Sequence, residues 1–404
     1  MSRAAVVLTA VLLLLLALAA PQAARAQGEP DVDAPAAILV EASTGDVVFE
    51  RNADEERSIA STTKLMTALL ALDGIALDDV ITAPGYDAGP AESVIGLREG
   101  ERMTVRDLLR ALLLASANDA AEALAVGLSG SVDRFVDEMN TRAEQLGLED
   151  TSYANPVGLD EQGNHSSARD LVRLAAILRR KPFFRETVDL PRAVLRSGSR
   201  RRTIQNRNVL VRNVPVVDGV KTGRTLQAGY VLVGSATRDG VTVLSAVLGE
   251  DTEAARDADT LALLRYGLGR YERRTVLEEG RELAEAGLDY RDDRVDLVAA
   301  ETVERVLRRG ERARVRVVGA PEELEGPLPA GAEVGTVEVR VRDRVVERVP
   351  LVTAVAVEEV SAADRIASVL SEPLSILLVV LLLVCTVLLA LLRRRVVRRA
   401  GGVR

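Results

Sequence analysis

The sequence predicts an α+β fold for the main part of the chain, because strands near both of its ends enclose a block of helices. Residues 36–41 and 46–51 are apolar or alternating around Ser43-Thr44-Gly45, a pattern typical of a β-hairpin. Three further strands are predicted after the helices, at 216–222, 230–236 and 241–248. We expect the early and late strands to form one antiparallel sheet.

The segment between these strands carries apolar residues at helical spacing. Residues 61–72 begin with Ser61-Thr62-Thr63, which are good capping residues, and place Leu65, Leu69 and Leu72 on one stripe. The other predicted helices are 104–115, 119–127, 132–146, 168–180 and, after the strands, 255–271. Residues 36–272 are therefore expected to form the main domain.

From about Arg273 the pattern changes to Val-rich alternating segments that are interrupted by prolines. This composition predicts a small all-β domain over 273–360. Its expected strands are 295–299, 313–318, 333–342 and 345–357.

The beginning of the chain is typical of an export signal. Arg3 supplies a positive start, 6–20 an apolar run, and Ala24-Arg25-Ala26 a small-x-small cleavage site. We predict a signal peptide over 1–26, with an uncleaved membrane anchor as the alternative, and a flexible lead-in over 27–35.

The end of the chain predicts a membrane tether. Residues 361–372 are interpreted as a stalk, and 373–392 as a transmembrane helix, because 374–392 hold no charge and are long enough to cross a bilayer. The basic tail, 393–404, favours a cytoplasmic end by the positive-inside tendency, and lipid recognition by its arginines stays open. We therefore predict an exported, single-pass membrane protein with its domains outside the cytoplasm.

The charge and the rare residue types exclude several classes. Two arginines fall in the signal and six in the tail, so the exported part has 44 basic against 60 acidic residues, about −16 with His neutral. Such a surface argues against nucleic acid as a partner. The one cysteine, Cys385, lies in the predicted transmembrane helix, and the chain has one histidine, His165. Because zinc sites are built mainly from cysteine and histidine, this composition argues against a zinc site. We expect no metal and no cofactor.

Lysine usage points to the chemistry. The chain has three lysines among 52 basic residues, and two of them close or open short patterns: Ser61-Thr62-Thr63-Lys64 and Lys221-Thr222-Gly223. Ser116-Ala117-Asn118 lies between them. Unlike arginine, a buried lysine can lose its proton and act as a base for a neighbouring serine. Ser61 and Lys64 are three apart at a helix start and share a face. The sequence therefore predicts a serine acyl-transfer enzyme.

These three elements, in this order, resemble those of the penicillin-recognising serine enzymes. Within that group the chain is similar to low-molecular-mass penicillin-binding proteins, the D-alanyl-D-alanine carboxypeptidases of the DacA type in serine peptidase family S11. The resemblance covers about residues 30–270, more loosely the β domain, and includes these segments: 58–67, 113–121, 155–159, 165–171, 206–210 and 218–225. It implies a transpeptidase-like fold, an antiparallel sheet flanked by helices plus a helical subdomain, with 36–272 as the serine DD-peptidase domain.

The resemblance also implies roles for the first two motifs. Ser61 would attack the carbonyl between two terminal D-alanines, and Lys64 would accept its proton. Ser116 would relay a proton to the departing D-alanine, and Asn118 would hold Lys64 and the substrate amide. The substrate would be a peptidoglycan stem pentapeptide ending in D-Ala-D-Ala, and β-lactams would be covalent inhibitors.

The third motif would form the other wall of the site. Lys221 would keep the site electropositive, Thr222 would bind the substrate carboxylate, and Gly223 would let the strand backbone approach the substrate closely. Backbone N–H groups of Ser61 and Arg224 would form the oxyanion hole. Arg224 is a departure, since the family more often has His, Phe or Tyr there.

Alternatives remain open at this point. Endopeptidase cleavage of crosslinks uses the same residues. A class A β-lactamase is disfavoured because no Glu-x-x-Leu-Asn stretch occurs between Asn118 and Lys221. A catalytically weak wall-binding scaffold or β-lactam sensor is disfavoured by the intact motifs. We interpret His165 as structural, because Ser61 already has a base nearby, and Asn206-Arg207-Asn208 as a turn buttress.

Overall fold

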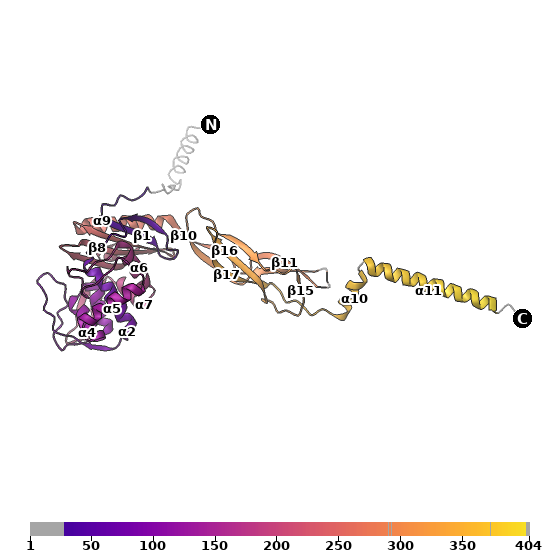
Figure 1. Cartoon of the computed structure of the whole chain (residues 1–404), viewed down its shortest axis with the longest axis horizontal. Helices are drawn as coiled ribbons and strands as arrows, with labels where there is room; N and C mark the ends of the chain where they lie inside the picture. The colour runs from indigo at the N-terminus through magenta and orange to yellow at the C-terminus, as the bar shows by residue number, and fades with distance from the viewer. Residues whose placement is uncertain (1–27, 290, 292, 372, 401–404) are drawn as a thin grey trace, which may run out of the picture. The chain divides into compact units, whose positions relative to one another are not determined.

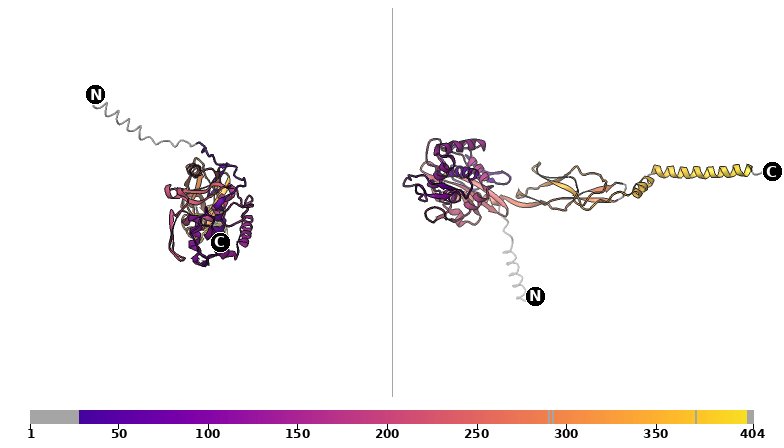
Figure 2. Two further views of the ribbon diagram at one scale, coloured as in Figure 1. Left: turned by 90° about the vertical axis from the view of Figure 1, so that its left-hand side faces the viewer. Right: turned by 90° about the horizontal axis from the view of Figure 1, so that it is seen from below.

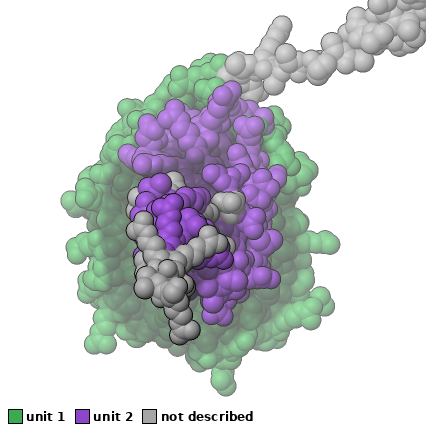
Figure 3. Space-filling model, turned by 90° about the vertical axis from the view of Figure 1, so that its right-hand side faces the viewer, with its two compact units in different colours: residues 1–272 green, residues 273–404 purple. Residues whose placement is uncertain are grey.

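The structure, a computed structural model, describes residues 28–289, 291, 293–371 and 373–400. The predicted signal peptide, 1–26, and the last residues of the basic tail, 401–404, lie outside the described residues. The chain divides into two compact units, 1–272 and 273–404 (Figure 3).

The centre of the first unit is a five-stranded antiparallel sheet in the order β2-β1-β9-β8-β7. Its strands are β1 (Ala36–Glu41), β2 (Val47–Arg51), β7 (Val217–Thr225), β8 (Gly229–Arg238) and β9 (Val241–Glu250). The prediction that the early hairpin and the late strands share one sheet is confirmed. The central strands are buried on both faces, since α9 (Glu253–Arg270) and α6 (Ala168–Arg179) cover opposite sides of the sheet (Figures 1 and 2).

A helical block packs on the side of the sheet that α6 covers (Figure 1). Its elements are η1 (Ala60–Thr63), α2 (Lys64–Gly74), α3 (Val105–Arg110), η2 (Ala111–Ala115), α4 (Asn118–Ser129) and α5 (Val132–Gln145). Leucine and alanine side chains of these helices form the core together with Ile38 and Ala246 of the sheet. All the helices that the sequence predicted are present, with ends shifted by one or a few residues.

Two of these helices differ in kind from the prediction. The segment predicted as a helix from Ser61 begins as a 3₁₀ turn, η1, and becomes α-helical only at Lys64. The predicted helix 104–115 is α-helical to Arg110 and then continues as a π-helix, η2. A π-turn takes up one extra residue per turn, and such turns recur at functional sites. It ends at Ser116, which has a left-handed backbone with φ of 59°.

Short elements that the sequence analysis did not predict connect the larger ones. They are the ribbons β3 (Val80–Thr82) with β4 (Arg102–Thr104) and β5 (Arg192–Leu195) with β6 (Arg202–Gln205), and the helices α7 (Pro182–Val188) and α8 (Val209–Asn213). The predicted flexible lead-in is packed in part, because Val32 and Ala34 are buried and the Asp259 carboxylate accepts hydrogen bonds from the backbone of Asp33 and Ala34.

The second unit is an all-β domain followed by helices. Its strands are β10 (Tyr271–Leu277), β11 (Glu282–Leu288), β12 (Arg294–Ala299), β13 (Val303–Arg308), β14 (Arg314–Val318), β15 (Glu323–Leu324), β16 (Glu333–Val341) and β17 (Arg344–Thr353). Six of them form one sheet, β14-β16-β17-β12-β11-β15, and β10 pairs with β13. The expected all-β class is confirmed, and the alternating apolar residues, such as Val337, Val339 and Leu351, form its core.

Two helices, α10 (Ala362–Ser371) and α11 (Pro373–Ala400), follow the β domain. Within α11, Ile376–Arg395 is long and apolar enough to cross a bilayer, and its apolar side chains are exposed. This agrees in length and composition with the predicted tether.

Candidate active site

Ser61 and Lys64 lie at the junction of η1 and α2. The 3₁₀ turn keeps the two side chains on one face, and the Lys64 amine donates a hydrogen bond of 2.8 Å to the Ser61 hydroxyl. Lys64 is fully buried. Burial lowers the pKa of Lys64 to about 7; nearby Glu92 opposes this shift and Arg207 adds to it. Near neutral pH the amine is therefore neutral in a large fraction of molecules, as a base requires.

A loop from residues 155–159 closes over Lys64. The carbonyl of Val157 accepts a second hydrogen bond from the Lys64 amine. Asn155 holds the loop, since its side-chain oxygen accepts from the backbone of Gly158 at 2.7 Å. Gly158 has φ of +83°, and a Cβ there would lie 2.0 Å from the carbonyl oxygen of Ala60. Only glycine permits this contact between the loop and the nucleophile turn.

Ser116 and Lys221 meet although they are 105 residues apart. The Lys221 amine donates to the Ser116 hydroxyl at 2.9 Å and to the Thr222 carbonyl at 2.7 Å. Lys221 is 1% exposed, and its pKa lies well below the ordinary value because of burial first, and then the cations Lys64, Arg207 and Arg256. The second and third motifs thus converge on one buried polar cluster.

Strand β7 runs past the nucleophile turn. A Cβ at Gly223 would lie 3.0 Å from the Ser61 amide nitrogen, from the Ile59 carbonyl and from the Ala60 side chain. Glycine at this place therefore allows the strand backbone to pass beside Ser61. Arg224 follows on the same strand, and its guanidinium lies 5.1 Å from the ring centre of Tyr230 on β8.

Asn118 begins α4, and its side chain is directed to a partner that the sequence analysis did not name. Its amide nitrogen donates to Glu92 at 2.7 Å. Among the described residues, Lys64 is instead held by Ser61 and the Val157 carbonyl, so the expected contact between Asn118 and Lys64 is not formed. Glu92 could not be found from a motif, because it lies in an irregular loop between β3 and β4.

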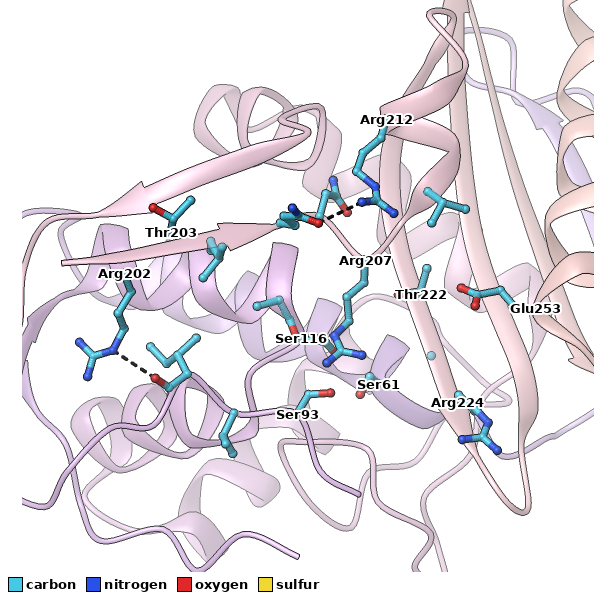
Figure 4. Close-up of a pocket in the computed structure, with 18 of the residues that line it drawn as sticks. Ser61, Ser93, Ser116, Arg202, Thr203, Arg207, Arg212, Thr222, Arg224 and Glu253 are labelled. Atoms are coloured by element: carbon cyan, nitrogen blue, oxygen red, sulfur yellow. Dashed lines mark hydrogen bonds between the residues drawn. The ribbon is translucent and has the colours of Figure 1, made fainter. Parts of the chain in front are cut away.

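These groups border a cavity of about 960 Å³ (Figure 4). Ser61, Ser116, Thr222 and Gly223 line it together with Ala91, Ser93, Val94 and Ile95 of the loop before β4. Seven arginines also line the cavity: Arg200, Arg201, Arg202, Arg207, Arg212, Arg224 and Arg256. Although the chain as a whole is acidic, this cavity is suited to an anionic ligand.

The Asn206-Arg207-Asn208 segment and His165, which we interpreted as structural, both make structural contacts. The Asn206 side chain donates to the carbonyls of Val188 and Leu190, and Asn208 donates to Gly219, which agrees with a turn buttress. Arg207 between them points into the cavity near Ser61 and Ser116, a contribution that the sequence analysis missed (Figure 4). His165 lies 3.6 Å from Glu56 at the surface and pairs through its backbone with Ser152.

Comparison with known proteins agrees with this site. Residues 23–252 match the model of the family described as D-alanyl-D-alanine carboxypeptidase, Peptidase S11. The chain belongs to the D-alanyl-D-alanine carboxypeptidase family. Residues 271–359 match a second family, described as the C-terminal domain of penicillin-binding protein 5.

Individual relatives of the family extend over most of the chain. It is 34% identical to the D-alanyl-D-alanine carboxypeptidase DacD of Escherichia coli, over 84% of this chain and 90% of that protein. It is 30% identical to DacF of Bacillus subtilis, over 79% of this chain and 84% of that protein. The crystal structure of penicillin-binding protein 5 from Haemophilus influenzae is similar with a TM-score of 0.61 and 30% identity, and covers 82% of this chain and 100% of that one. The chain is thus a family S11 hydrolase of peptidoglycan metabolism with the fold that the resemblance implied.

Proposed function

We propose that this protein removes the terminal D-alanine from peptidoglycan stem peptides through an acyl-enzyme on Ser61. The hydrogen bond of 2.8 Å between the Lys64 amine and the Ser61 hydroxyl, with Lys64 fully buried and its pKa near 7, carries this proposal. A serine hydroxyl needs such a base at hydrogen-bond distance to become a nucleophile.

In the acylation step, Lys64 accepts the proton of Ser61 as Oγ bonds to the carbonyl carbon of the penultimate D-alanine. The backbone N–H groups of Ser61 and Arg224 stabilise the oxyanion, a contribution of about 3 kcal/mol per donor in other enzymes. The C–N bond then breaks, and Ser116, held by Lys221, donates its proton to the leaving amine and takes up the proton that Lys64 accepted. In the second step Lys64 accepts a proton from the water that attacks the ester carbonyl and returns it to Ser61 Oγ as the ester bond breaks, so that the shortened peptide leaves and the enzyme is restored.

The third motif and the arginines that line the cavity account for the specificity. The substrate ends in a free carboxylate, and Thr222 binds this carboxylate beside the buried side chain of Lys221. Arg207 adds positive charge to the cavity. A β-lactam places a carboxylate and a strained amide in the same positions, so it acylates Ser61 and blocks the enzyme.

The anchored location follows from the two ends of the chain. We propose that the signal exports both domains and that Ile376–Arg395 spans the membrane, so that the catalytic domain acts on the wall outside the cytoplasm.

The test is release of D-alanine from a D-Ala-D-Ala peptide by the full chain in detergent. We expect Ser61→Ala and Lys64→Ala to abolish release. Lys181→Ala is the matched control, because Lys181 is a lysine paired with Asp73 away from the cavity and should retain activity. Release that persists in Ser61→Ala, or none from the wild type, would contradict the proposal.

A further inference from the structure

Glu92 contacts Asn118 of the second motif but belongs to none of the three motifs itself. The segment that carries it runs between β3 and β4, and its neighbours Ser93, Val94 and Ile95 line the cavity. Glu92 is half-buried, and its carboxylate accepts from Asn118 at 2.7 Å, from the Gly89 backbone at 3.0 Å, and from the Tyr86 hydroxyl. A carboxylate with three donors has a defined position.

The contact fixes which way the Asn118 amide points. An ionised carboxylate only accepts hydrogen bonds, so the nitrogen end of the amide must be the end that faces Glu92. The pKa of Glu92 stays below its ordinary value: burial alone would raise it, but the hydrogen bonds from Tyr86 and Asn118 outweigh burial. Glu92 is therefore ionised at neutral pH, and the oxygen end of Asn118 is directed away from it.

The segment that carries Glu92 is itself fastened to the start of α4. The Asn118 backbone donates to the Ser93 carbonyl at 2.6 Å. The Asp119 carboxylate accepts from the backbone of Ile95 at 3.2 Å and of Leu97 at 2.9 Å. These bonds join the segment to the helix on both sides of the Asn118 side chain, so the carboxylate is held in place by backbone and not only by the residue that it positions.

Glu92 is also the negative charge that acts on Lys64. Glu92 raises the pKa of Lys64 and Arg207 lowers it, and the charge of Lys64 in turn lowers the pKa of Lys221. Glu122 of α4 is close enough to Glu92 for its own pKa to be raised by burial and by that charge, yet it is not among the groups that shift Lys64.

We propose that Glu92 is a positioning residue for acylation, which orients the Asn118 amide toward the substrate and supplies the charge that balances the ammonium form of Lys64. The role rests on the proposed function, since it requires Ser61 and Lys64 to be nucleophile and base. Two effects follow, and different variants separate them. The charge of Glu92 affects the pH at which Lys64 loses its proton, and the position of the Asn118 amide affects the maximal rate of acylation.

The experiment measures the rate of acylation of the full chain in detergent by a fluorescent penicillin, from about pH 5 to about pH 9. Glu92→Gln removes the charge and leaves one acceptor oxygen in place of two, so at least one of the three donors, Asn118, Tyr86 or the Gly89 N–H, faces an NH2 group. We expect the acid limb of its pH–rate profile, where the rate rises as Lys64 loses its proton, to move to lower pH, because Lys64 loses its negative neighbour. We also expect its rate at high pH to fall by about tenfold. Glu92→Asp keeps the charge but shortens the side chain, so its limb should stay in place while its rate falls.

Glu122→Gln is the matched control, because it removes a nearby carboxylate that does not act on Lys64, and it should leave both the limb and the rate unchanged. Thermal melting shows that each variant is folded. A Glu92→Gln limb that superposes on the wild type, or an equal shift in Glu92→Asp or Glu122→Gln, would overturn the role of Glu92. No acylation of the wild type would instead overturn the proposed function, and the role with it.

Discussion

Lys221 of β7 donates a hydrogen bond to Ser116, the residue that ends the π-helix η2, at 2.9 Å across 105 positions of sequence. This bond joins the sheet to the helical block at the cavity. It exists because the π-turn and the left-handed backbone of Ser116 turn its hydroxyl toward the strand. Relay of a proton by Ser116 would depend on this geometry.

Replacement of Lys221 by arginine tests the role of the hydrogen bond between Lys221 and Ser116. Arginine is larger and always charged, whereas Lys221 is almost fully buried with a pKa well below the ordinary value, because burial disfavours its charge. We expect Lys221→Arg to lower kcat/KM for D-alanine release by about a hundredfold or more. Lys181→Arg, at the surface, should have no effect. Near wild-type activity in Lys221→Arg would show that a fixed positive charge is sufficient there.

The pH dependence of the reaction should report Lys64. Since the neutral amine is the active form and its pKa is about 7, kcat/KM should fall about tenfold per pH unit below that value and level off above it. The measurement is D-alanine release over a series of buffers at constant ionic strength. A profile that stays flat through this range would mean that Lys64 is not the base that limits the step.

Gly223 tests how closely β7 must pass Ser61. In Gly223→Ala the new Cβ would lie 3.0 Å from the Ser61 amide nitrogen, which we place in the oxyanion hole. We expect a loss of kcat/KM on the order of tenfold or more, with little change in melting temperature. Gly287→Ala on β11 is the control, because its Cβ would meet only ordinary contacts at 3.5 Å or beyond. Equal activity in both variants would show that glycine is not required at position 223.

A buried ion pair beside the cavity should make the stability of the folded state depend on pH. Glu101 and Arg202 are 2.9 Å apart, with side chains 3% and 7% exposed. The hydrogen bond from Arg202 is the largest cause that lowers the pKa of Glu101 from 4.5 to about 2. A depressed carboxyl pKa stabilises the folded state above about pH 4.5, and this contribution is lost as the pH falls toward 2.

Glu101→Gln leaves the Arg202 charge buried without its partner, and we expect it to cost about 3 kcal/mol at neutral pH. Denaturant unfolding at neutral and at acidic pH measures both effects. The variant should differ from the wild type less at low pH, where Glu101 is protonated in both states. A difference that does not depend on pH would assign the loss to packing instead of charge.

The predicted tether can be tested by truncation. A chain that ends at residue 372 lacks α11 and should leave the membrane fraction, whereas the full chain should resist extraction by alkaline carbonate. External protease should reach both domains in spheroplasts. Persistent membrane association of the truncated chain would point to an uncleaved N-terminal signal as the anchor.

The sequence by itself determined the strands of the central sheet, several strands of the β domain, the main helices and the three motifs, because each has a local signature; β3 to β6, β10, β11, β13 and β15 were not predicted. Alternation and helical spacing are set by neighbours along the chain, and Ser61 and Lys64 share a helical turn whatever the rest of the fold does. The lysine rarity and the motif order were enough to place the chain in its chemical class, and the family match agrees with that prediction.

Only the tertiary structure decided which groups surround those motifs. The contact of Asn118 with Glu92, the Val157 carbonyl on Lys64 and the position of Arg207 join segments that are 26 to 93 residues apart or lie in irregular loops. Local propensity carries no information on such pairs, because they are set by packing of the whole domain. The low pKa of Lys64 is likewise a property of burial, which no single segment of sequence contains.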